Sequence, residues 1–147
     1  MQEASFTERK RRAAKIVAAL KKLFPNARIV LNYSSNWELL VAVILSAQCT
    51  DKKVNEVTAK LFKKYRALNA YLKANPKEFE KDIRPTGFFR AKTKNILAAA
   101  NMVKEKFGGK IPKTMAEMLK IPGVARKTAN VVLGNAFGVP ALAVDTH

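Results

Sequence analysis

The sequence contains a single cysteine, Cys49, among its 147 residues. One thiol cannot form a disulfide within the chain, and it cannot supply a metal site built from several cysteines. We therefore expect neither a disulfide framework nor a metal ion held by this chain. A lone thiol is also typical of a protein from a reducing compartment.

Long apolar runs are lacking as well. No stretch reaches the eighteen or so apolar residues that a transmembrane helix needs. Residues 1–5 do not lead from a basic segment into an apolar one, as a signal peptide would. These features predict a soluble, intracellular protein that does not act at a membrane.

Acidic residues are few: the sequence has 11 Asp and Glu and 28 Lys and Arg, which gives a net charge of +17. Such an excess on a small protein predicts a polyanionic partner, since release of counterions from a phosphate backbone favours binding. RNA or an anionic membrane surface would satisfy the same electrostatics. A basic surface that only confers solubility is the alternative without a partner.

Paired β-strands and internal repeats are not indicated, and apolar residues recur at three- and four-residue intervals through most of the chain. This periodicity predicts an all-α fold. The expected helices cover approximately residues 6–24, 39–47, 51–65, a short segment from 76, 90–107, 114–121 and 126–137. Residues 29–33 are expected to be extended.

Start signals support several of these helices. Ser or Thr followed three residues later by Glu predicts a capping box, and the pattern occurs at Ser5, Ser35 and Thr114. Asp51 and Asn75 are the expected caps of two further helices. The apolar residues of segment 39–47 lie on all sides of the helix, so this helix is predicted to be fully buried.

The most informative segment is residues 119–129, with the sequence LKIPGVARKTA. A short helix, a Pro-Gly turn and a second helix would leave several backbone N–H groups unpaired at the start of the second helix, where they can bind a phosphate. Gly123 would supply a positive φ and a close backbone approach to a nucleic acid. The alternative is an ordinary turn between helices, but the net charge favours phosphate binding.

Three separated motifs occur along the chain: LSAQCTD at residues 45–51, TGFFRAK at 86–92, and IPGVARKTANVVL at 121–133 followed by AVDTH at 143–147. Together they resemble the signature of the endonuclease III family of DNA glycosylases. The resemblance implies a helix-hairpin-helix DNA glycosylase with a six-helix barrel, the hairpin lying at about residues 115–137. It also implies a bifunctional glycosylase and lyase that removes oxidised pyrimidines in base-excision repair.

By this resemblance, Lys127 is the nucleophile that attacks the anomeric carbon of the damaged nucleotide. The resulting Schiff base permits β-elimination and strand cleavage. Asp145 would stay ionised, stabilise positive charge on the sugar and help to deprotonate the attacking group. The positive end of the helix dipole favours a neutral amine at Lys127, whereas the neighbouring carboxylate favours the ammonium form, so the two influences oppose each other.

Further DNA contacts are implied by the same resemblance. Gln48 would fill the gap left by a flipped base, and Phe88 would act as a wedge. A glutamine buried in a helix and a core phenylalanine are the alternative interpretations of these two residues. The remaining expected DNA contacts are Arg90, Lys92, Pro122, Gly123, Val124, Ala125, Arg126, Thr146 and His147.

The sequence departs from the family pattern in two places. Ala125 stands where a second hairpin glycine is common. The family also continues past Asp-Thr-His into helices and four cysteines that bind a four-iron four-sulfur cluster, so no cofactor is expected in this chain. We divide it into an N-terminal helix (1–28) that would pack on the absent region, a barrel (29–139) and the start of an incomplete cluster domain (140–147). Asp145, two residues from the end of the sequence, is expected to fray, and the apolar face of the first helix is expected to be poorly covered.

Double-stranded DNA with a damaged base or an abasic site is the expected partner, bound by a monomer in the cytoplasm or at the nucleoid. Two outcomes remain open for the chain: residual DNA binding without activity, which we favour, or a minimal active enzyme. A non-enzymatic helix-hairpin-helix DNA-binding module is an alternative function. An enzyme like the monofunctional adenine glycosylases is another, although that branch generally lacks a lysine at the position of Lys127.

Overall fold

The structure is a computed structural model that describes residues 4–145. This range forms helices and no strand, so the prediction of an all-α fold is confirmed. The elements are α1 (Phe6–Leu23), α2 (Asn36–Leu45), α3 (Asp51–Lys64), α4 (Leu68–Leu72), α5 (Pro76–Ile83), the 3-10 helix η1 (Arg84–Thr86), α6 (Phe89–Lys106), α7 (Met115–Met118) and α8 (Arg126–Phe137). None of the helices in residues 4–145 is long and apolar enough to cross a membrane.

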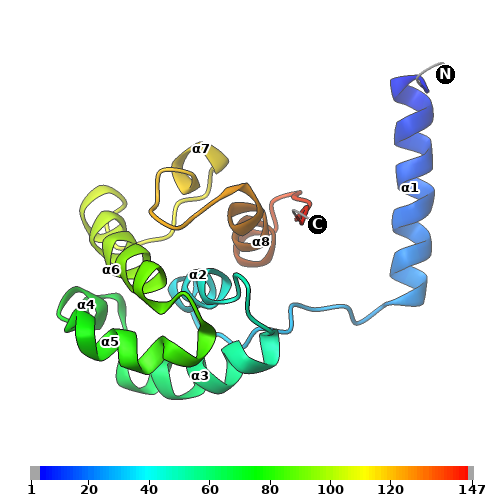
Figure 1. Cartoon of the computed structure of the whole chain (residues 1–147). Coiled ribbons are helices and arrows are strands. Elements are labelled where there is room, and N and C mark those ends of the chain that lie inside the picture. Colours follow the sequence, from blue (N-terminus) through cyan, green and yellow to red (C-terminus); the bar gives the residue numbers. More distant parts are fainter. Residues whose placement is uncertain (1–3, 146–147) are drawn as a thin grey trace.

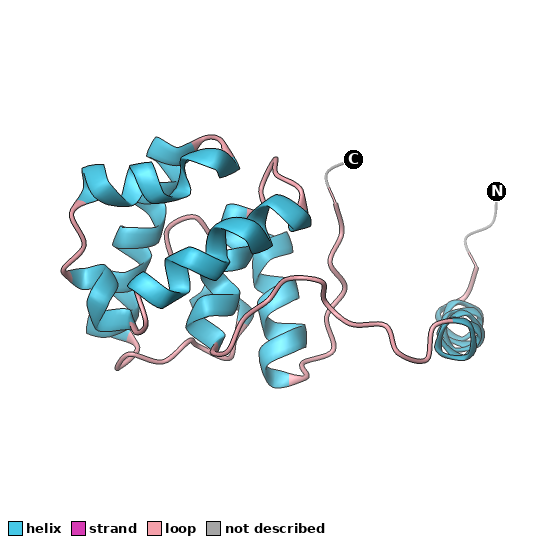
Figure 2. Cartoon of the chain, turned by 90° about the horizontal axis from the view of Figure 1, so that it is seen from below, coloured by secondary structure: helices cyan, strands magenta, loops and turns pink. Residues whose placement is uncertain are grey.

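Helix α2 lies at the centre of the packed helices, with α3, α6 and α8 around it (Figures 1 and 2). Every residue from Trp37 to Leu45 is buried, which confirms the predicted buried helix. The covering helices contribute Val54, Ile96 and Val132, each fully inaccessible to solvent. Since apolar side chains project on all sides of α2, the core forms around this helix rather than along one face of it.

An aromatic cluster joins α2 to the next three helices. Tyr71 contacts Trp37 edge-on, with ring centroids 5.1 Å apart, and also packs against Tyr65 and Phe79. Tyr71 belongs to α4, a five-residue helix that the periodicity did not reveal. This helix starts without a side-chain cap, and it is too short to show a helical repeat.

The predicted caps are partly correct. Ser5 and Glu8 form a reciprocal capping box. The cap of α3 is Thr50, whose hydroxyl accepts from the Lys53 amide, so the prediction of Asp51 was wrong by one residue. Asp51 is instead the first helical residue, where its negative charge favours the helix start.

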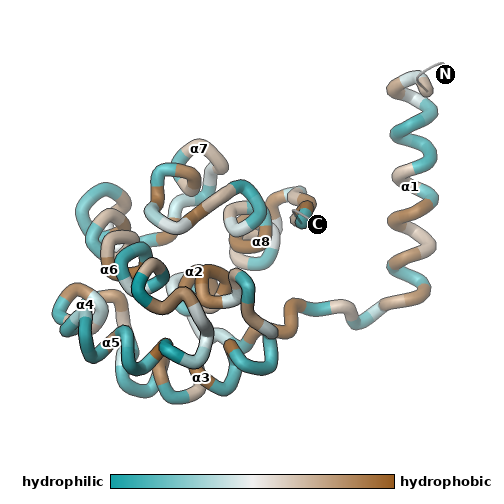
Figure 3. The backbone as a smooth tube through the Cα atoms, in the orientation of Figure 1, coloured by the Kyte–Doolittle hydropathy of each residue, from teal (hydrophilic) through white to brown (hydrophobic). Residues whose placement is uncertain are grey.

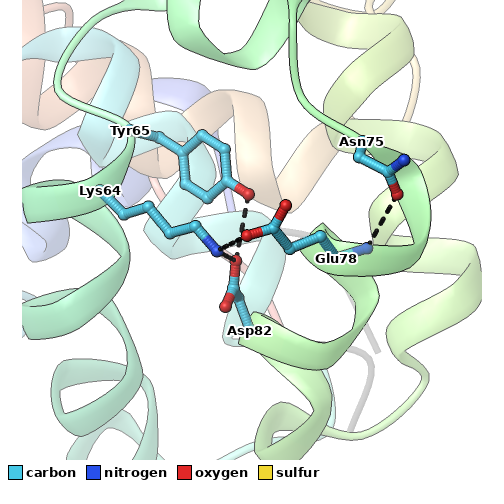
Figure 4. Close-up of polar contacts among 5 residues, drawn as sticks. All are labelled: Lys64, Tyr65, Asn75, Glu78 and Asp82. Carbon is cyan, nitrogen blue, oxygen red and sulfur yellow. Dashed lines mark hydrogen bonds and ion pairs between the residues drawn. The ribbon is translucent and has the colours of Figure 1, made fainter.

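Helices α3 and α5 are joined by an ion-pair network (Figure 4). Lys64 Nζ lies 2.6 Å from Glu78 Oε1 and 2.7 Å from Asp82 Oδ2, and the Tyr65 hydroxyl donates to the same Asp82 oxygen. Asn75 caps α5 as predicted, because its side-chain oxygen accepts from the Glu78 amide at 3.1 Å. The network is largely exposed and adds little stability by itself.

Helix α1 stands apart from the other helices at the end of an extended segment (Figure 1). None of its residues is buried. Apolar residues nevertheless gather on the second half of the helix (Figure 3), and Ile16, Leu20 and Leu23 are each about half exposed or more. The prediction of a poorly covered apolar face on the first helix is therefore confirmed.

Candidate active site and nucleic-acid interface

Helices α7 and α8 and the turn between them form the predicted helical hairpin. Ile121 and Val124 are buried and anchor the turn, and the Val124 amide donates to the Ile121 carbonyl at 3.1 Å. Ala125 is the N-cap of α8, and it provides no side-chain hydrogen bond to the first turn. The N–H groups at the start of α8 are therefore not capped by a side chain of their own, which leaves them suited to an anionic ligand.

Gly123 has φ +79°, so the predicted positive φ is confirmed. The reason for a glycine is also visible within the protein. A Cβ at this position would lie 2.8 Å from Cβ of Asn95 in α6. The turn of the hairpin is therefore pressed against α6, and a side chain at Gly123 would separate them.

Lys127 and Asp145, the predicted catalytic pair, are brought together by the fold. The Lys127 ammonium donates to Asp145 Oδ2. The two side chains are 48% and 53% exposed, so the pair is accessible from solvent. Lys127 lies in the first turn of α8, whereas Asp145 lies in the irregular segment after this helix.

The ion pair lies at a cleft of about 500 Å³ between the α2–α3 loop and α8. The cleft combines apolar walls with polar groups from both elements. Its lining residues are Ile29, Leu31, Val43, Ser46, Ala47, Gln48, Cys49, Asp51, Lys127, Thr128, Val131 and Asp145. A pocket with an apolar lining and a few convergent polar groups is the usual form of a small-ligand site, and this one can accept a planar group beside an amine.

Gln48 and Phe88 share an unusual backbone conformation. They are the two non-glycine residues with positive φ in residues 4–145, at 54° and 44°. Both side chains are exposed, Phe88 by 70%. The alternative interpretations, a buried helix glutamine and a core phenylalanine, are therefore wrong. Left-handed backbone at non-glycine residues is strained and is common at functional sites.

Lys92 is not where a phosphate contact requires it to be. Its side chain is only 5% exposed, and Nζ donates to the carbonyls of Leu45 and Thr86, at 2.8 Å each. Burial lowers the pKa of this lysine. The prediction that Lys92 contacts DNA is therefore corrected. Arg90 is exposed, with its guanidinium 5.4 Å from the Phe89 ring centroid.

The other predicted contacts differ in exposure. Ala125 and Arg126 are exposed at the start of α8, and Pro122 is half-buried. The Val124 side chain is buried, so a DNA contact there could involve only its backbone. Thr146 and His147 lie outside the described residues.

Two residues of the cleft wall were not expected from the sequence. Thr128 and Ser46 line the cleft but were not predicted as site residues. Thr128 directly follows Lys127 in the motif at residues 121–133, and Ser46 precedes Gln48 by two residues in the motif at residues 45–51. Their position in those motifs was the available signal.

Comparison with known families identifies the class of protein to which this helical hairpin and cleft belong. The family described as "HhH-GPD superfamily base excision DNA repair protein" matches residues 41–147, which is most of the chain. This chain belongs to that superfamily.

Among individual relatives, Endonuclease III of Synechocystis sp. is 52% identical over 140 residues, covering 95% of this chain and 64% of the relative. Endonuclease III of Bacillus subtilis is 51% identical over 85% of this chain and 57% of the relative. Endonuclease III of Escherichia coli is 41% identical over 94% of this chain and 65% of the relative. The chain thus spans somewhat less than two thirds of the length of these relatives.

Solved structures agree. The protein in a non-covalent Endonuclease III–DNA complex superposes with a TM-score of 0.86 at 47% identity, covering 94% of this chain and 64% of that one. A thermostable thymine-DNA glycosylase superposes with a TM-score of 0.82 at 26% identity, covering 96% of this chain and 65% of that one. The predicted helix-hairpin-helix glycosylase fold is therefore confirmed.

Proposed function

We propose that this chain carries the reactive part of a bifunctional DNA glycosylase and lyase that acts on oxidised pyrimidines. The proposal rests above all on the contact between Lys127, in the first turn of α8, and Asp145, both of which line the cleft. An amine beside a carboxylate, next to a pocket of base-accepting size, provides the groups that an imine mechanism requires.

The proposed reaction begins with loss of a proton from the Lys127 ammonium, for which Asp145 is the acceptor in contact. The neutral amine then forms a bond to the anomeric carbon while the glycosidic bond breaks, and the departing base takes up the proton that Asp145 holds. Asp145, again ionised, stabilises the positive charge on the sugar. The bond between the ring oxygen and the anomeric carbon then breaks as a proton passes from the amine to that oxygen, which gives the Schiff base. The Schiff base permits removal of a sugar proton and cleavage of the bond to the 3′ phosphate, and hydrolysis then releases Lys127.

Several features support duplex DNA as the partner. The net charge of +17 favours any polyanion, and the uncapped start of α8 suits one backbone phosphate. The exposed, left-handed Gln48 and Phe88 suit insertion into a duplex from which a base has been flipped. The endonuclease III relatives, one of them solved as a DNA complex, support the same partner and a place in base-excision repair.

The proposed reaction uses protein side chains alone. The cysteine content does not fit an iron–sulfur cluster with four cysteine ligands, because Cys49 is the single cysteine of the sequence. In residues 4–145 no group of three or more His, Cys, Asp or Glu side chains could hold a metal ion.

We place the chain in the cytoplasm or at the nucleoid, acting as a monomer.

A non-enzymatic DNA-binding module would use the hairpin but would not need the Lys127–Asp145 pair. A monofunctional enzyme of the adenine-glycosylase type would not need Lys127. Both alternatives predict that loss of the lysine leaves the DNA chemistry of the chain unchanged.

The test is a strand-cleavage assay on a labelled duplex that contains one oxidised pyrimidine or one abasic site. Lys127→Gln is compared with Lys104→Gln, which removes an exposed lysine near the C-terminal end of α6. The sequence alone favoured DNA binding without activity, but the contact between Lys127 and Asp145 favours an active chain. We therefore expect the parent and Lys104→Gln to cut both duplexes, and Lys127→Gln to bind them without cutting. A parent that binds but cuts neither duplex, or Lys127→Gln activity equal to the parent, contradicts the proposal.

A further inference from the structure

Lys92 differs from the other described side chains because it donates to two backbone carbonyls in separate segments of the chain. It lies in the first turn of α6, and its ammonium bonds both Leu45 and Thr86, which are 47 and 6 residues away along the chain. Both acceptors are backbone carbonyls. The amine therefore holds two separate segments of main chain together.

Each carbonyl closes a helix. Leu45 is the last residue of α2, and Thr86 is the last residue of η1. Carbonyls at helix ends lack an intrahelical donor, and a cation placed there also opposes the negative end of the helix dipole. Thr86 is itself buried, and its hydroxyl donates to the Ile83 carbonyl at 2.8 Å. Both carbonyls therefore belong to buried residues that are held in place, and they serve below as the two fixed points of the backbone.

The chain continues from each fixed point to one of the two left-handed residues. Gln48 follows Leu45 by three residues, and Phe88 follows Thr86 by two. Short turns join them: the Cys49 amide donates to the Ser46 carbonyl, and the Gly87 amide donates to the Arg84 carbonyl. With so few residues between, the position of each carbonyl restricts the position of the residue that follows it.

A buried lysine is an expensive way to satisfy two carbonyls. Taking an ammonium out of water is unfavourable, and an apolar side chain of similar volume could fill the space. What an apolar residue cannot do is bond two chain segments at once. The burial of Lys92 is therefore better explained by the separation that it sets than by the stability that it adds.

We propose that Lys92 is a positioning residue that holds the Gln48 loop and the Phe88 loop at a fixed separation, so that both side chains can enter one lesion in duplex DNA. This inference rests on the proposed function, because it assigns the two loops to lesion recognition. Lys92 itself does not touch the DNA.

The test uses the whole chain and three variants. Lys92→Met removes the ammonium at similar length, Lys92→Arg retains a long cationic donor, and Lys104→Met is the matched control on the exposed part of α6. Amide hydrogen exchange is measured at Cys49 and Gly87, which report the two loops, and at Ala129, whose amide bonds Ala125 within α8. Binding to an abasic duplex is measured against binding to the same duplex without a lesion.

In Lys92→Met we expect exchange at Cys49 and at Gly87 to rise by about tenfold relative to Ala129, since each loop loses a charge-assisted hydrogen bond. Preference for the abasic duplex should fall by a similar factor. Lys92→Arg should recover part of both effects, and Lys104→Met should show neither. If Lys92→Met does not fold, Lys92→Gln replaces it, with a smaller change expected in the same direction.

Three results overturn the inference: equal acceleration at Ala129, acceleration in one loop alone in Lys92→Met, or loosened loops with unchanged preference for the lesion. A parent chain without preference for the abasic duplex contradicts the proposed function instead. In that case the exchange data still decide whether Lys92 couples the two loops.

Discussion

Gly123→Ala should be one of the most destabilising single-methyl additions in this chain. Gly123 has φ +79°, where an alanine is strained, and the added Cβ would lie 2.8 Å from Cβ of Asn95. Because Cβ of Asn95 is attached to the backbone of α6, it cannot rotate away. Either α6 or the hairpin turn must move.

The magnitude can be divided into two parts. The left-handed backbone costs alanine about 1–2 kcal/mol, and insertion of a methyl group into a packed contact costs about 1–3 kcal/mol. Gly123→Ala is therefore expected to lower the free energy of unfolding by about 2–5 kcal/mol. Gly138→Ala isolates the first part, because Gly138 has φ +62° and a Cβ there would meet nothing within 4 Å.

Urea unfolding of the parent and both variants, followed by helix circular dichroism, measures the two costs. We expect Gly123→Ala to cost at least about 1 kcal/mol more than Gly138→Ala, and the difference to measure the contact with Asn95. Equal losses in the two variants would mean that the hairpin is not pressed against α6.

Three further predictions concern single side chains. Glu38 is buried and accepts from the amide and hydroxyl of Ser34 at 2.6 Å each, so Glu38→Gln should cost about 1–3 kcal/mol in urea unfolding; an unchanged midpoint contradicts this. Burial raises the pKa of the Tyr71 hydroxyl above 10.0, so the protein should lose stability as the pH rises above 10. In thermal melts, Tyr71→Phe should lose less stability over this range, and an identical dependence on pH would contradict the prediction. Phe88 is 70% exposed, so Phe88→Ala should change stability by less than about 0.5 kcal/mol while lowering affinity for an abasic duplex; a large drop in melting temperature would place Phe88 in the core.

Local patterns predicted the helices well where the sequence carries its own signals. The bounds of α8 follow from the Pro-Gly turn before it and Gly138 after it, and α8 begins and ends where predicted. The start of α1 follows from the Ser5–Glu8 capping box. Helix α4 has neither signal, since its stability comes from burying Tyr71 against residues distant in the sequence.

The site was predictable to the extent that its residues lie in contiguous motifs. Lys127 and Asp145 were predicted from two such motifs, and the fold places them in contact. Lys92 was misinterpreted because a lysine close to Arg90 in a basic helix normally faces solvent. Its true environment depends on the Leu45 carbonyl, and no local pattern reports a contact across that distance.

Borohydride trapping shows directly whether Lys127 forms an imine with DNA. The chain is incubated with a duplex containing one abasic site, the imine is reduced, and the cross-linked residue is identified by mass spectrometry. We expect a covalent protein–DNA complex that is attached at Lys127 and is absent from Lys127→Gln. DNA binding without a trapped complex, or attachment at another lysine, would contradict it.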